Sequence, residues 1–430
     1  MNDTYCSFAT RYQRIGEFLH GIDTVLYIPE KCKNDLGVLV MHSDGNYLSF
    51  SAGPELAKRG YMTLCANVAD PGAPLEKKLT SVKTAMEVLR SQHGIGRIVL
   101  FGHSGGATLM SCYQAAAENG PEIFRDGNRI VPMGDVPDLP AADALMLIDS
   151  NFGTGVMTLV SIDPGVTDES SGTNTDPEYF PFTTEHGFTR EGETCYTEEF
   201  KTKFFAAQAD RQKRLISSAL ERLEALNEHQ GKFVDDEPLI IPGGSQIAPN
   251  NRLFPQDLHL LSHTKDSYDL IHGRDGSVTH EVIRSRRTAR GDLYGTPILG
   301  LGAAITTVRS YLSSSCVRTV QDYAVREDGI TGIDYDSAFC CTPGNVKHIH
   351  CPLLIMGMTG GYECIASEII FENAASEDKT IAFVEGGTHM IGTATDAEAY
   401  PGEFGDAPKT LYDRIATWLD AKSKYIGGKK

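Results

Sequence analysis

One stretch constrains this chain more than any other, the run IVLFGHSGG from Ile98 to Gly106. Its apolar residues are typical of a buried strand, and they lead directly into Gly-x-Ser-x-Gly and a run of small residues that can begin a helix. In such a strand-to-helix turn the central residue, here Ser104, stands exposed. We expect glycine at Gly102 and Gly106 because a Cβ atom at either position would crowd the neighbouring backbone. The stretch therefore predicts a nucleophile elbow centred on Ser104.

The segments around this stretch alternate between apolar runs and amphipathic runs. Continuous apolar runs at residues 36–41, 61–67, 97–101 and 143–149 predict strands that are covered on both faces. Helix patterns separate them, and the clearest one spans residues 74–93. This alternation predicts an α/β fold, in which helices cover both faces of a mostly parallel sheet.

The alternation stops after residue 153 and resumes at residue 346. Between them lie a long amphipathic helix pattern at 198–230 and an apolar helix pattern at 297–312, so we predict a large, mainly helical cap insertion. The predicted organisation therefore has three parts. Residues 1–153 form the first part of the core, residues 154–345 the inserted cap or lid, and residues 346–430 the second part of the core.

Charge and composition narrow the partners of the protein. The 430 residues carry a formal net charge of −18, which argues against nucleic acid or an anionic membrane surface as a partner. We find no apolar window near the ~18 residues of a membrane span and no signal-peptide layout at the N-terminus. The ten cysteines are scattered, and we expect reduced thiols in a cytoplasmic protein.

Reactive groups follow several of the predicted strands. In an open α/β sheet the site forms at the carboxyl ends of the strands. Ser104 follows one strand, and His389 follows the last one in the sequence Gly-Gly-Thr-His. A serine hydroxyl needs an adjacent base in order to attack, and that base needs an orienting acid. We therefore predict Ser104 as nucleophile and His389 as general base.

The order of these motifs resembles the α/β-hydrolase superfamily. The resemblance rests on the His42-Ser43-Asp44-Gly45 loop, the elbow at Ser104 and the His389 loop, and it covers about residues 20–153 and 346–425. It implies an oxyanion hole made of two backbone amides. One amide belongs to Gly105 and the other to Ser43 or Asp44. Many members have glycine directly after the loop histidine, where this chain has Ser43, so both loop amides stay candidates.

The resemblance also implies an acid a few residues past the penultimate strand of the sheet. There, Glu363 is the carboxylate nearest to the expected spacing. Glu368, at the start of the following helix pattern, and Asp149, at the end of the strand after the elbow, are the alternatives.

Together these expectations describe a serine hydrolase that cleaves a carboxylic ester-like bond of a small or medium organic substrate through an acyl-enzyme. We expect no metal and no organic cofactor, and a small molecule as the partner rather than nucleic acid or membrane. The same residues would also serve a lactonase, a thioesterase or a carbon–carbon bond hydrolase. An alternative from another class is a non-catalytic small-molecule binding protein on the hydrolase fold, which would form no acyl-enzyme.

Overall fold

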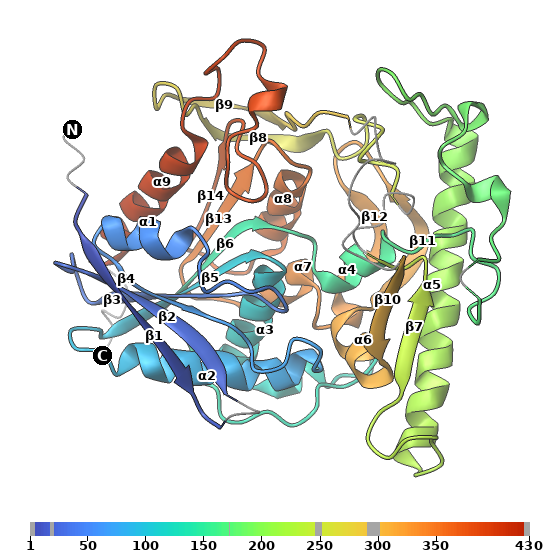
Figure 1. Cartoon of the computed structure of the whole chain (residues 1–430), viewed down its shortest axis with the longest axis horizontal. Helices are drawn as coiled ribbons and strands as arrows, with labels where there is room; N and C mark the ends of the chain where they lie inside the picture. Colours follow the sequence, from blue (N-terminus) through green and yellow to red (C-terminus); the bar gives the residue numbers. More distant parts are fainter. Residues whose placement is uncertain (1–4, 18–20, 172, 246–251, 290–301, 425–430) are drawn as a thin grey trace.

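A ten-stranded sheet forms the centre of the computed structural model, which describes residues 5–17, 21–171, 173–245, 252–289 and 302–424 (Figure 1). The strand order is β1-β2-β4-β3-β5-β6-β13-β14-β8-β9. In chain order these strands are β1 (Phe8–Ile15), β2 (Ile22–Pro29), β3 (Leu36–Met41), β4 (Met62–Ala66), β5 (Arg97–Ser104), β6 (Ala144–Ser150), β8 (His263–Ile271), β9 (Val278–Arg284), β13 (Leu353–Met358) and β14 (Lys379–Val384).

The sheet is mostly parallel, which confirms the predicted fold class. Every neighbouring pair from β4 through β8 in this order is parallel, whereas β1, β2 and β9 pair antiparallel at the two edges. The helices are α1 (Ala52–Lys58), α2 (Leu75–Arg90), α3 (Gly105–Asn119), α4 (Thr154–Leu159), α5 (Glu198–Asn227), α6 (Val308–Ser314), α7 (Thr342–Asn345), α8 (Glu363–Asn373) and α9 (Ala407–Lys422).

Helices cover both faces of the sheet because its central strands are apolar on both sides (Figure 1). In β3, Leu39 and Met41 belong to the core under α2, α3 and α8. Val38 and Val40 belong to the opposite core, under α1 and α9. Each core is thus built from alternate residues of the same strands, and the sheet is held rigidly between two packed layers.

Two helices lie where the sequence pattern predicts them. Helix α2 matches the pattern at 74–93, and α5 matches the pattern at 198–230. The Thr197 hydroxyl accepts the N–H of Phe200 and so begins α5 with a side-chain cap. The long amphipathic pattern therefore forms one continuous helix of 30 residues.

The helix predicted at 297–312 is wrong over residues 303–307, which form a strand, and correct over 308–312; residues 297–301 lie outside the described residues. Strand β10 (Ala303–Thr307) pairs with β7 (Pro238–Pro242), and α6 begins only at Val308. The Thr307 hydroxyl accepts the N–H of Ser310, so the chain leaves the strand and enters a helix at a capped residue. The β-branched residues just before the cap favour a strand over a helix.

Between residues 154 and 345 the described residues form a mixture of helices and strands rather than a mainly helical unit. The pair β11 (Arg318–Val325) and β12 (Ile330–Asp334) forms a small sheet, as do β7 and β10. The hairpin of β8 and β9 joins the central sheet beside β14. The β8–β9 hairpin is mostly polar and exposed, without a regular alternation of buried and exposed residues, so its sequence resembles a surface loop. None of the helices among the described residues has the length and apolarity to cross a membrane.

Candidate active site

The turn from β5 into α3 places Ser104 in a strained backbone conformation. Ser104 has φ 54° and ψ −126°, which is unusual for a residue with a side chain. A Cβ atom on Gly102 would lie 2.7 Å from the carbonyl oxygen of Gly106, and one on Gly106 would lie 2.4 Å from that of Met41. The expected steric need for both glycines is confirmed, and the sharp turn presents the Ser104 hydroxyl at the end of the sheet.

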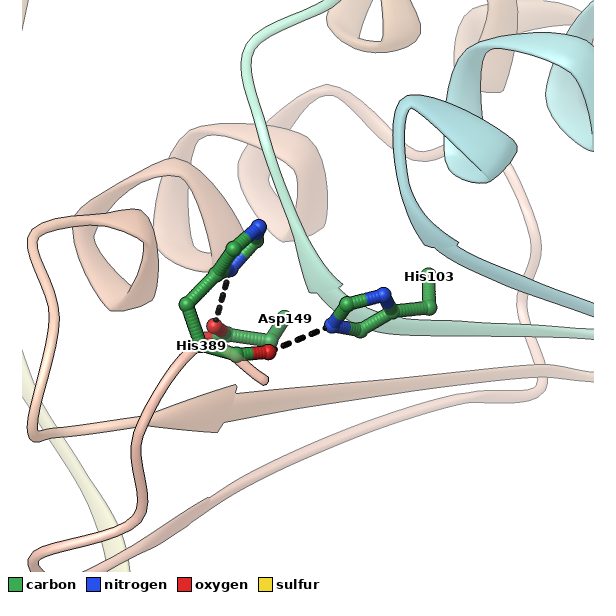
Figure 2. Close-up of side chains that lie close together, drawn as sticks. All are labelled: His103, Asp149 and His389. Carbon is green, nitrogen blue, oxygen red and sulfur yellow. Dashed lines mark hydrogen bonds and ion pairs between the residues drawn. The ribbon is translucent and has the colours of Figure 1, made fainter. Parts of the chain in front are cut away.

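His389 comes to Ser104 from a loop that follows β14. Its Nε2 lies 2.9 Å from Ser104 Oγ, although 285 positions separate the two residues. The loop is a tight turn in which Thr388 N–H donates to the Gly392 carbonyl at 2.9 Å. Figure 2 shows the imidazole of His389 beside the carboxylate of Asp149.

Asp149 is the carboxylate that bonds directly to His389. Its Oδ2 accepts from His389 Nδ1 at 2.7 Å, and its Oδ1 accepts the N–H of Met358 at 2.8 Å. Asp149 is fully buried and has φ 43°, so both Ser104 and Asp149 hold strained backbone conformations. Strain of this kind persists where the surrounding structure fixes a functional geometry.

The other two candidate acids lie at different distances from the imidazole. Glu363, the first residue of α8, places Oε1 3.7 Å from His389 Nδ1. Glu368, one and a half turns further along α8, accepts the N–H groups of Lys265 and Asp266 in β8, both at 2.8 Å. The structure thus brings Asp149 and Glu363 to His389, while Glu368 anchors the β8–β9 hairpin.

Burial and the two carboxylates set the charge state of this cluster. Burial lowers the pKa of His389, but the charge of Glu363 and the hydrogen bond and charge of Asp149 outweigh it and raise the pKa to about 9. Burial raises the pKa of Asp149 to about 6, against the hydrogen bond from His389. Near neutral pH the imidazole is therefore held as a cation beside two acids, and it becomes a free base only at higher pH.

The three candidate N–H groups of the oxyanion hole differ in whether they already donate to an acceptor in the protein. Asp44 N–H donates to His42 Nδ1 at 3.2 Å, and Gly45 N–H donates to the same nitrogen at 2.8 Å. Among the described residues, neither the amide of Ser43 nor that of Gly105 has an acceptor. The two are also close, because a Cβ atom on Gly105 would lie 2.9 Å from Ser43 Oγ. Ser43 and Gly105 are therefore neighbouring residues whose N–H groups have no acceptor among the residues that the structure describes.

Sequence reasoning missed His103, the residue before the nucleophile. Its Nε2 lies 2.6 Å from the carbonyl oxygen of His389, and its Nδ1 lies 2.6 Å from the hydroxyl of Tyr47 (Figure 2 shows the first contact). A signal was present in the alternation of β5. Val99 and Phe101, on the same face as His103, belong to an apolar core, and a polar side chain there needs a partner.

Among the described residues, two further groups bring three potential metal-ligand atoms within 4.8 Å of one another. They are Cys195, Asp257 and His259, and the acidic group Asp266, Glu368 and Glu372. In both groups the buried carboxylate already accepts backbone N–H groups, Asp257 from Tyr196 and Glu368 from the β8 strand. Neither arrangement lies in the Ser104 cluster.

No known protein family profile matches the chain, and no curated protein matches it. Solved structures are similar over nearly the whole chain at low identity. DcsB in complex with its substrate analogue has 9% identity and a TM-score of 0.43 over 97% of this chain and 100% of that one. Brefeldin A esterase, a bacterial homologue of human hormone sensitive lipase, has 10% identity and a TM-score of 0.40 over 99% and 80%. Est1E from Butyrivibrio proteoclasticus has 12% identity and a TM-score of 0.38 over 96% and 98%.

The internal features of the structure identify its fold. A mostly parallel sheet carries a strained serine in a Gly-x-Ser-x-Gly turn, and helices pack on both faces. Ser104, Asp149 and His389 occur in the chain order serine, acid, histidine, and all lie at carboxyl ends of strands or in the loops that follow them. The chain has the α/β-hydrolase fold.

Proposed function

We propose that the protein is a serine hydrolase that cleaves a carboxylic ester-like bond of a small or medium organic substrate. The observation that carries the proposal is the continuous contact from Ser104 Oγ to His389 Nε2, at 2.9 Å, and from His389 Nδ1 to Asp149 Oδ2, at 2.7 Å. A serine, a base and a buried acid in this order form the machinery that activates a hydroxyl for attack on a carbonyl.

Each side chain has a defined role in the proposed reaction. Neutral His389 accepts the proton of Ser104 as its hydroxyl oxygen attacks the carbonyl carbon, and it later gives that proton to the leaving group. Asp149 orients the imidazole and stabilises the cation that forms. Water then attacks the acyl-enzyme with His389 as base again, which frees the acid product and restores the serine.

We assign the oxyanion hole to the backbone amides of Gly105 and Ser43. Both lack a protein acceptor among the described residues, whereas the Asp44 amide already donates to His42. Donors of this kind stabilise the charge that develops on the carbonyl oxygen. The side chain of Ser43 itself is buried, so its contribution here is the main-chain N–H.

We also propose the three-part organisation 1–153, 154–345 and 346–430, in which the middle part covers the site. Contacts between the insertion and the loop after β13 support this arrangement. Ser285 Oγ donates to the Gly361 carbonyl at 2.8 Å, and Arg286 N–H donates to the Thr359 carbonyl at 2.6 Å. Arg252 lies 3.4 Å from the Tyr362 hydroxyl. These contacts hold the insertion over the loop that leads to Glu363, where it would limit the size of the substrate. The ten free cysteines support a reducing compartment such as the cytoplasm.

Covalent labelling tests the function directly. We expect a fluorophosphonate probe and a p-nitrophenyl ester each to form a single adduct on the wild-type protein, detected by intact mass. Ser104→Ala should form neither adduct and should keep the thermal unfolding midpoint of the wild type. Labelling that persists in Ser104→Ala would refute the nucleophile, and a wild type that binds esters without any adduct would favour a non-catalytic binding protein.

A further inference from the structure

A buried histidine lies directly beneath the base of the proposed triad. His103 is fully buried, and its ring centroid lies 4.9 Å from that of His389. Its two ring nitrogens each have one partner at 2.6 Å, the His389 carbonyl oxygen and the Tyr47 hydroxyl. Tyr47 is itself held in place by Phe50, whose ring stacks on it at 4.3 Å. The contacts join the loop after β3, the end of β5 and the loop after β14.

These partners determine the protonation state of His103. A carbonyl oxygen can only accept, so Nε2 must carry a hydrogen and donate it to His389. Burial and the nearby charges of His389 and His42 hold the pKa of His103 well below its ordinary value, so the ring is neutral and Nδ1 carries no hydrogen. Nδ1 therefore accepts from Tyr47, whose pKa is raised by burial and whose hydroxyl keeps its proton. The hydrogen bonds run in one direction, from Tyr47 through His103 to the main chain of His389.

The position of His103 in the chain gives this contact a mechanical consequence. His103 and Ser104 are adjacent residues of β5, and His103 pairs with Ile148 in the neighbouring strand. The same strand end therefore fixes both the nucleophile and the main chain of the base. Ala394 N–H donates to the Gly386 carbonyl at 2.7 Å across the base of the loop that carries His389, and Gly360 N–H donates to the Gly387 carbonyl at 2.6 Å. The contact from His103 adds to these bonds at the residue that bears the imidazole.

We propose that His103 is a positioning residue that sets the distance between Ser104 Oγ and His389 Nε2, with Tyr47 as the donor that orients it. This inference rests on the proposed function and deepens it, because it assigns a role to two residues outside the triad. His103 holds the main chain of His389, while Asp149 holds its side chain. Together they leave the imidazole little freedom to move away from the serine, which is the condition for efficient proton transfer.

Three variants test the proposal by removing the contacts separately. His103→Leu leaves the His389 carbonyl and the Tyr47 hydroxyl without a partner. His103→Gln restores an N–H at about the reach of the imidazole Nε2 and so keeps the bond to His389. Tyr47→Phe removes only the donor that orients the ring. His280→Leu is the matched control, because the His280 side chain is 67% exposed and lies on the far hairpin strand β9.

We expect the acylation rate with a p-nitrophenyl ester to fall roughly tenfold to a hundredfold in His103→Leu, as for a buried acceptor left unsatisfied. Tyr47→Phe should lose roughly fivefold, as for one neutral hydrogen bond, and His103→Gln should recover most of the loss. KM should stay within about twofold in all of them, because none of these groups needs to touch the substrate. His280→Leu should match the wild type.

The measurements separate a positioning role from a structural one. Each rate is divided by the fraction of protein that a fluorophosphonate labels at completion, so that unfolded protein does not lower the measured rate. Equal rates per labelled site in His103→Leu and wild type would overturn the proposal, as would His103→Gln no better than His103→Leu. If the wild type neither labels nor turns over, the proposed function itself fails, and that result is distinct from either of these.

Discussion

The variant Glu363→Gln gives the sharpest test of how charge controls this site. Glu363 Oε1 lies 3.7 Å from His389 Nδ1. At an effective dielectric constant of about 20, two unit charges at 3.7 Å attract by about 4.5 kcal/mol, or more than a thousandfold in the proton affinity of the imidazole. Burial of His389 offsets part of this attraction, and its pKa is about 9 rather than 6.5.

Glutamine keeps the shape of the side chain and removes its charge. Asp149 still raises the pKa of His389 and burial still lowers it, so we expect the value to fall toward the ordinary 6.5. Only the neutral imidazole can act as base. At pH 7 the neutral fraction is about 1% for a pKa of 9 and about three quarters for a pKa of 6.5. Removing this carboxylate should therefore increase kcat/KM at pH 7 by tens of fold.

The assay is the dependence of kcat/KM on pH with a p-nitrophenyl ester. In the wild type kcat/KM should rise with pH through about 9, the pKa of His389. In Glu363→Gln the rise should occur nearer pH 6.5, with a similar plateau. Glu372→Gln, an exposed change on the same helix, should leave the midpoint at its wild-type value. A midpoint unmoved in Glu363→Gln would refute the electrostatic reasoning, and a loss of activity at every pH would show that Glu363 is the orienting acid.

Three further changes test the acid, the elbow and the insertion. Asp149→Asn should lower kcat on the order of 10³- to 10⁴-fold at every pH, because the imidazole loses the acceptor that orients it. Thermal unfolding of the unlabelled variant should stay cooperative. A near-normal kcat would exclude Asp149 as the orienting acid. Gly106→Ala should lower the thermal midpoint and kcat together, because its Cβ would meet the Met41 carbonyl at 2.4 Å; an unchanged midpoint contradicts the clash. Arg211→Met should cost about 1–3 kcal/mol in denaturant unfolding, because it leaves the carbonyl oxygens of Asp163 and Pro242 without the buried guanidinium that donates to them; an unchanged free energy of unfolding would contradict this.

The sequence was most informative where a residue pattern maps onto one local structure. The elbow is a local turn, so its glycines and the exposure of Ser104 follow from five adjacent residues. Helix α5 has a capping threonine and a regular apolar stripe, and its ends lie within a few residues of the prediction.

The carboxylate that contacts His389 is determined by the three-dimensional fold, and the spacing of residues in the sequence could not identify it. Spacing favoured Glu363, yet the carboxylate hydrogen-bonded to His389 is Asp149, 240 positions away in the chain. The left-handed backbone at Asp149 bends its side chain out of an apolar strand toward the imidazole, and nothing in the run Ala-Leu-Met-Leu-Ile-Asp-Ser reveals that bend. The hairpin of β8 and β9 was missed for a related reason, because its partner strand lies more than a hundred residues further along the chain.

That hairpin changes what can be removed from the protein. Strand β14, which carries the His389 loop, is flanked by β13 on one side and by β8 on the other, with Phe383 paired to Leu270 and Val384 to Ile271. The insertion therefore cannot be removed without loss to the sheet, because its removal would take away a hydrogen-bonded neighbour of the strand that precedes the His389 loop. A chain without the insertion would leave the edge of β14 unpaired. An unpaired strand edge promotes association with other chains, so such a variant is expected to aggregate before its activity can be assayed.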